Sequence, residues 1–80
     1  IINTGAIVEH DCVVEDFVNI CPGVSMAGHT RIGRKSFIGI GSTVIDDIRV
    51  GKEVVIGAGA AVIRDIPDYA VAVGVPAKVR

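Results

Sequence analysis

The sequence predicts an all-β protein, a parallel β-helix of about four triangular coils, and two periodicities carry this prediction. Aliphatic residues, with one methionine among them, return at every sixth position from residue 2 to residue 62. A second column, four positions after the first, holds small or aliphatic side chains and no charge. An α-helix would spread such a pattern around its surface, and a half-buried strand alternates every two residues. A six-residue period is instead typical of parallel β-helices, in which equivalent positions of successive coils stack.

Each hexad is expected to form a short strand followed by a corner. The first inward column consists of Ile2, Val8, Val14, Ile20, Met26, Ile32, Ile38, Val44, Val50, Ile56 and Val62. The second consists of Ala6, Cys12, Val18, Val24, Thr30, Ser36, Ser42, Ile48, Val54, Ala60 and Ile66. Pairs that tolerate tight bends separate the columns, among them Thr4-Gly5, Pro22-Gly23 and Asp46-Asp47. Three hexads make one coil of eighteen residues, so residues 1–67 are expected to form the β-helix.

The two ends of the chain are expected to differ. The period stops at Pro67, and the segment 68–80, DYAVAVGVPAKVR, is expected to cap the last coil. The first coil has no such cap, and the chain starts at Ile1, already inside the repeat. Since natural proteins cover open strand edges, we expect further sequence on the N-terminal side.

The composition gives no sign of a nucleic-acid or membrane partner. The net charge of −1 and the mixed order of acidic and basic residues offer no basic stripe for nucleic acid and no polybasic membrane patch. No apolar run approaches the roughly 18 residues of a membrane span. Cys12, on the inward column, and Cys21, on an outward column, form no disulfide framework, which favours a reducing cytoplasm. With only two histidines, no metal site is expected.

One column eighteen residues apart is entirely glycine: Gly5, Gly23, Gly41 and Gly59. The simplest interpretation is a corner that needs a left-handed backbone, which glycine adopts freely. The alternative adds a shallow groove along this bare corner. The preceding column of small to medium residues, Thr4, Pro22, Ile40 and Ala58, would suit an alkyl-amide chain such as pantetheine.

The two histidines are the candidates for acid–base chemistry. His10, in VEHDC, lies at a corner between Glu9 and Asp11, where an acid could orient the imidazole of a general base. A solvated turn histidine is the alternative. His29, in MAGHT, has no acid beside it in the sequence and is predicted to lie at the surface.

Apolar residues also fall on outward positions, namely Ile7, Val13, Phe37, Ile45, Val55 and Ile63. Aliphatic side chains on the flat side of a prism are often buried between subunits. A three-sided prism fits closed cyclic symmetry, so a homotrimer is predicted.

Three segments carry a family resemblance: IINTGAIVEHDC, AGHTRIGRKSFIGIGSTV and VAVGVPAKVR. They resemble the hexapeptide-repeat acyltransferases with a left-handed parallel β-helix. The most similar family is that of bacterial sialic acid O-acetyltransferases and UDP-amino-sugar N-acetyltransferases. The left hand is implied only by this resemblance, because ordinary crossover connections are right-handed.

The resemblance implies an acetyl-CoA-dependent transfer to a sugar or nucleotide-sugar, with His10 as general base and Asp11 as its partner. It also implies acetyl-CoA contacts at Asn19, Gly28, Ile40, Ala58 and Gly59. Some relatives have a second histidine where this chain has Asn19. Relatives carry an N-terminal acceptor-binding domain, which is not expected within these 80 residues.

Two alternatives stay open. The first is a hexapeptide acetyltransferase for another small acceptor, such as serine or a xenobiotic. The second is a non-catalytic β-helix that serves as a trimerisation module. The His10-Asp11 corner favours an enzyme, since a scaffold has no use for it.

Overall fold

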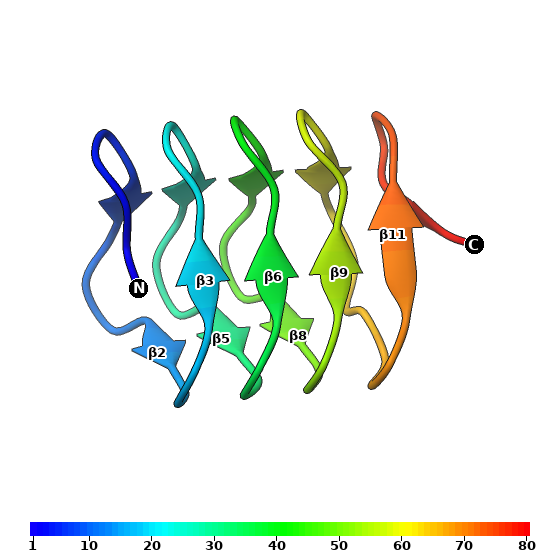
Figure 1. Ribbon diagram of the computed structural model, residues 1–80, viewed down its shortest axis with the longest axis horizontal. Helices are drawn as coiled ribbons and strands as arrows, with labels where there is room; N and C mark the ends of the chain where they lie inside the picture. The colour runs from blue at the N-terminus through cyan, green and yellow to red at the C-terminus, as the bar shows by residue number, and fades with distance from the viewer.

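The computed structural model describes residues 1–80 as a stack of coils that advances along one axis from the N-terminus to the C-terminus (Figure 1). The stack measures 27 × 21 × 20 Å. It contains no helix that could span a membrane. Its strands are β1 Ile7–Val8, β2 Val13–Val14, β3 Asn19–Ile20, β4 Ser25–Met26, β5 Arg31–Ile32, β6 Phe37–Ile38, β7 Thr43–Val44, β8 Arg49–Val50, β9 Val55–Ile56, β10 Ala61–Val62, β11 Val71–Val73 and β12 Lys78–Val79.

The strands form three sheets, one for each side of a triangular prism. β1, β4, β7 and β10 form the first side, β2, β5 and β8 the second, and β3, β6, β9, β11 and β12 the third. Pairing in the coils is parallel, and Ile7 pairs with Ser25, eighteen residues later. The same step relates Val13 to Arg31. The predicted eighteen-residue parallel coil is therefore confirmed.

The two inward columns form the core. Every member from Val18 to Ile66 is buried, and most are completely so. The members in the first coil are more exposed, Ile2 by 53%, because no coil lies below them. The hydroxyls of Ser36 and Ser42 donate hydrogen bonds to carbonyls of the following coil, at 2.8 and 2.9 Å. These bonds satisfy polar groups that would otherwise be buried without partners.

The corners require left-handed backbone at regular positions. Gly5, Gly23, Gly41 and Gly59 have φ of 77°, 74°, 69° and 69°, as the all-glycine column predicted. A side chain at Gly41 or Gly59 would meet nothing within 4 Å. The positive φ, and not crowding, is therefore what favours glycine at these two positions.

The three sides of the prism differ in their outward side chains. The first side presents Ile7, Ser25, Thr43 and Ala61. The second presents Val13, Arg31 and Arg49. The third presents Asn19, Phe37, Val55 and Val71. The apolar residues predicted to point outward are all 40–59% exposed in the single chain.

The C-terminal segment departs from the eighteen-residue step. β11 continues the third side in parallel with β9, but Val71 pairs with Val55, sixteen residues earlier. β12 then returns antiparallel to β11. Residues 71–79 thus close the end of the third sheet, where β11 lies at the end of the stack in Figure 1.

Cys21 differs from its expected outward position, because it is buried with only 8% exposure. Its column lies against the next coil. A side chain built at Gly39, the equivalent position one coil later, would approach the backbone nitrogen of Ala58 to 2.7 Å. The next coil therefore leaves little room for a side chain at Gly39.

Candidate active site

The corner between the first and second sides gathers most of the candidate chemistry. We call it the histidine corner, and it consists of residues 9–12, 27–30, 45–48 and 63–66. Asp11, His29 and Asp47 occupy the same place in successive coils, with φ of 61°, 61° and 60°. Aspartate and histidine are among the residues that accept this left-handed conformation most readily. A carboxylate, an imidazole and a second carboxylate therefore follow one another along this corner, from Asp11 through His29 to Asp47.

His10 and Asp11 lie together, as predicted, and His29 joins them. The Oδ2 atom of Asp11 is 3.9 Å from Nε2 of His10 and 3.7 Å from Nε2 of His29. The two imidazole rings are 6.2 Å apart, edge to face. All three side chains are open to solvent, at 85% for His10, 68% for Asp11 and 53% for His29. These distances are within reach of a hydrogen bond after a small side-chain rotation, or through one water.

His29 is exposed, as predicted, but its acid comes from the preceding coil and not from its sequence neighbours. The sequence does contain a signal for this contact, since Asp11 and His29 are eighteen residues apart. A comparison of the corner columns, made in the way that revealed the glycine column, would have paired them.

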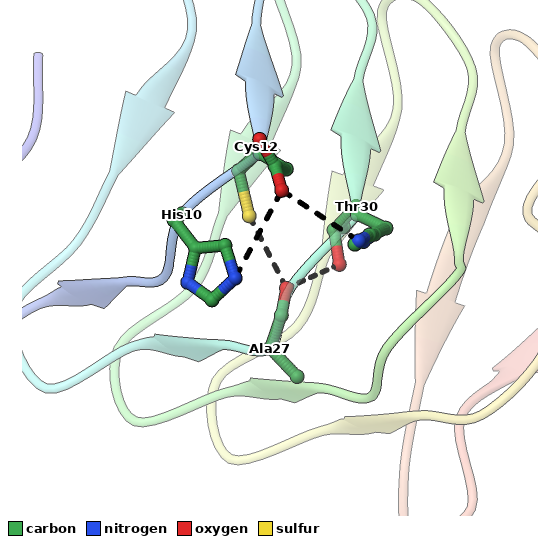
Figure 2. Close-up of polar contacts among 6 residues, drawn as sticks. His10, Cys12, Ala27 and Thr30 are labelled. Carbon is green, nitrogen blue, oxygen red and sulfur yellow. Dashed lines mark hydrogen bonds and ion pairs between the residues drawn. The ribbon is translucent and has the colours of Figure 1, made fainter.

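Two side-chain hydrogen bonds fix the backbone of the coil next to the histidines. Figure 2 shows Cys12 and Thr30 converging on the carbonyl of Ala27, with His10 beside Cys12. The thiol of Cys12 donates to that carbonyl at 3.2 Å and the hydroxyl of Thr30 at 2.7 Å. A side chain added at Gly28 would lie 3.5 Å from the carbonyl oxygen of His10. Gly28 is thus the one predicted acetyl-CoA contact that this chain places beside His10.

A shallow groove of about 430 Å³ runs along the first side next to the histidine corner. Ser25 and Thr43 supply hydroxyls in its lining, and Ile7 and Ile45 supply apolar surface. The carboxylates of Glu9 and Asp46 also line it. These carboxylates can accept hydrogen bonds from the hydroxyl or amino groups of a ligand. Glu9 is the sequence neighbour of His10, so such a ligand would lie near that histidine.

The remaining predicted acetyl-CoA contacts lie elsewhere on the prism. Ile40, Ala58 and Gly59 are exposed on the corner between the third and first sides, which we call the glycine corner. Asn19 is exposed on β3 of the third side. The chain alone therefore does not bring these residues to His10.

The glycine corner forms no groove in the single chain. The backbone N–H of Gly41 donates to the carbonyl of Pro22 at 3.1 Å, and that of Gly59 to Ile40 at 2.8 Å. None of the three surface grooves is lined by a residue of the all-glycine column. A channel at this corner would need a second surface to complete it.

The second side is charged, a feature that the sequence analysis did not single out. A groove of about 420 Å³ there is lined by Glu15, Arg31, Arg49, Lys52 and Asp68 together with glycines. Arg31 donates to Glu15 at 2.9 Å, and the backbone N–H of Arg34 donates to the same carboxylate at 3.0 Å. The Arg31 hydrogen bond, aided by Arg34, holds the pKa of Glu15 below its ordinary value.

Comparison with known proteins finds a family match over part of the chain. Residues 29–64 match the bacterial transferase hexapeptide family, described by six repeats. Two curated relatives are a probable serine acetyltransferase 2 from Oryza sativa subsp. japonica and a serine acetyltransferase from Haemophilus influenzae. They are 40% and 36% identical over 84 residues. Each alignment covers 95% of this chain but only 24% and 32% of the relative.

Solved structures match the fold closely. A mutant of perosamine N-acetyltransferase from Caulobacter crescentus, in complex with CoA and GDP-perosamine, has a TM-score of 0.96 and 40% identity, covering 98% of this chain and 37% of that one. The acetyltransferase domain of PglB from Neisseria gonorrhoeae, in complex with acetyl coenzyme A, has a TM-score of 0.97 and 46% identity, covering 99% and 38%. These neighbours establish the expected left-handed β-helix. The chain spans between 24% and 38% of the length of these proteins.

Proposed function

We propose that this hexapeptide-repeat β-helix is the catalytic part of an acetyl-CoA-dependent acetyltransferase, with a sugar or nucleotide-sugar as acceptor. One observation carries the proposal. His10 and Asp11 stand together on an exposed corner of a β-helix that matches structures solved with CoA and with acetyl coenzyme A. The O- or N-character of the transfer depends on the acceptor.

The reaction needs a base, and His10 is placed to be one. Its imidazole would take the proton from the acceptor's amine or hydroxyl as that group attacks the thioester carbonyl of acetyl-CoA. The carbon–sulfur bond then breaks, and the CoA thiolate receives the proton from His10. The nearby Asp11 would favour the imidazolium that forms between these two steps.

Direct transfer is favoured over a covalent acyl-enzyme. Cys12 is half-buried and its thiol is bonded to the carbonyl of Ala27. Cys21 is buried. Neither thiol is presented at the histidine corner as a nucleophile, so positioning and a base would supply the catalysis.

A homotrimer would complete the site. In our proposal the glycine corner of one protomer, with Ile40, Ala58 and Gly59, faces the histidine corner of its neighbour. The division of the predicted site residues between two corners of one chain supports this arrangement. Acetyl-CoA would then lie in the channel between the protomers, and the acceptor would approach along the groove lined by Ser25 and Thr43.

The solved neighbours point to two acceptor classes. Sugar N-acetyltransferases share 40–46% identity with this chain, and serine acetyltransferases among the solved structures share 33–37%. Among the solved structures the higher identities favour a sugar acceptor, although one curated serine acetyltransferase is also 40% identical. Serine is the second candidate because both curated relatives described above are serine acetyltransferases. The two free thiols support a reducing compartment, and we propose the cytoplasm.

The test is calorimetric titration of the 80-residue chain with acetyl-CoA, at a concentration where sedimentation shows its oligomeric state. Assays of CoA release then follow with GDP-perosamine and with L-serine as acceptors. Saturable binding, and release with the sugar nucleotide only, is the expected result. Release of CoA with L-serine only would overturn the sugar acceptor and favour serine. A folded trimer that binds no acetyl-CoA would favour the trimerisation module.

A further inference from the structure

The histidine corner contains an imidazole that the proposed mechanism does not use. His29 lies one coil above Asp11, in the same corner position and with the same φ of 61°. Strand spacing places such residues about 4.8 Å apart along the prism. Asp47 follows in the next coil, so His29 has an acid in the coil on either side.

The side chain of His29 nevertheless selects one of these acids. Its Nε2 atom is 3.7 Å from Oδ2 of Asp11, and no other carboxylate lies within ion-pair distance. The same Oδ2 atom faces His10 at 3.9 Å. A carboxylate oxygen has two lone pairs and can accept a hydrogen bond from each imidazole. Asp11 is therefore shared between two histidines from different coils.

We infer that His29 is a positioning residue for His10, acting through Asp11. By donating from Nε2 to the Asp11 carboxylate, His29 holds that side chain at the corner, where it can orient the His10 imidazole. This inference rests on the proposed function, in which His10 is the base. It adds a role for a residue that touches neither the thioester nor the acceptor in that mechanism.

The side chains themselves explain why such support is useful. Asp11 is 68% exposed and projects from a left-handed turn, so neither packing nor a backbone hydrogen bond holds its carboxylate. An exposed carboxylate samples several rotamers, each of which points its charge differently. A donor from the coil above restricts this choice. The less exposed of the two imidazoles, His29, is better fixed to supply it.

The first test uses NMR to detect the coupling of His29 to His10 through Asp11, and it needs no activity assay. The chain has only two histidines, so the imidazole signals of His10 and His29 are readily assigned by NMR from single variants. We expect His29→Asn to move the His10 signals. In an Asp11→Asn background, the same substitution should leave them nearly unchanged. A direct ring-current effect of one ring on the other would persist in that background, so it would contradict coupling through Asp11.

The second test reads catalysis. Asparagine accepts the positive φ but is too short to place a donor at the Nε2 position, so His29→Asn removes the contact with little backbone strain. We expect kcat to fall about five-fold with KM for acetyl-CoA unchanged, as for a group that acts on the chemical step. His29→Gln, whose amide reaches further, should restore part of the rate. Lys35→Asn, at a left-handed position with φ of 60° on another corner, is the matched control and should leave kcat unchanged.

The outcomes separate the two proposals. In a chain already carrying Asp11→Asn, His29→Asn should cost nothing further, because both substitutions break one chain of contacts. A His29→Asn variant with full kcat would overturn the positioning role while leaving His10 as the base. A chain that shows the NMR coupling but acetylates no acceptor would overturn the proposed function, and the positioning role with it.

Discussion

His29 and Asp11 are one full coil apart in the sequence, yet Nε2 of His29 lies 3.7 Å from Oδ2 of Asp11. The same oxygen faces His10, so a single exposed carboxylate links the two imidazoles of the chain. Because the link runs between coils, the geometry of the histidine corner depends on the stacking of the β-helix and not only on the local turn.

Replacing His10 by alanine should remove the base without disturbing the fold. The side chain is 85% exposed, so the coil loses little packing. We expect kcat to fall by ~10²-fold or more, while the affinity for acetyl-CoA stays nearly unchanged. Calorimetry and steady-state assays would measure both. Arg64→Ala, which replaces an exposed residue three coils after His10 in the same corner, is the control. An alanine variant with normal turnover would exclude His10 from the mechanism.

Gly41→Val should destabilise the coil. With φ of 69°, a β-branched side chain is strained, at a cost of about 1–2 kcal/mol in the free energy of unfolding. We also expect weaker binding of acetyl-CoA, since the glycine corner is proposed to line its channel. Gly41→Asn is the matched variant, because asparagine accepts positive φ. An asparagine variant that melts normally and binds acetyl-CoA normally would place the channel elsewhere.

The Glu15–Arg31 pair should make the thermal stability of the fold depend on pH in the acidic range. Its hydrogen bonds lower the folded-state pKa of Glu15 below 4.5, so the carboxylate stabilises the fold above that value. This contribution is lost as the pH falls through the lowered pKa. Thermal melts should therefore show Glu15→Gln melting below the wild type at pH 7, with the difference closing in acid. Glu9→Gln, whose side chain makes no hydrogen bond, should show no such gap. A gap that widens in acid would contradict the assignment.

The proposed trimer should depend on exposed apolar residues of the histidine corner. Ile45 and Ile63 stack in successive coils there and are 40% and 42% exposed in the single chain. Replacing both by glutamate would bury two charges in the interface, so sedimentation should show dissociated protomers. Arg49→Glu, on the charged second side, is the control and should remain trimeric. A trimer that survives the double substitution would move the interface to another side.

The periodic parts of the structure could be predicted from the sequence because each depends on a short-range requirement. The inward columns repeat since every coil must bury the same two positions, and Val18 through Ile66 are indeed buried. The all-glycine column marks a left-handed turn, which is a property of one residue's backbone. The placement of His10 beside Asp11 follows from their adjacency.

The stacking of residues eighteen apart was predicted, but which side chains touch within a column was decided only by the tertiary structure. Cys21 is buried because the next coil lies close above it, a distance that no local pattern fixes. His29 meets Asp11 because the side chains of stacked corners turn toward one another. The sequence predicted residues for the candidate site, and the closure of the prism places two of them, His10 and Gly59, on different corners. A triangular coil returns each residue to its own column, so it brings together residues eighteen apart and separates those that belong to different corners.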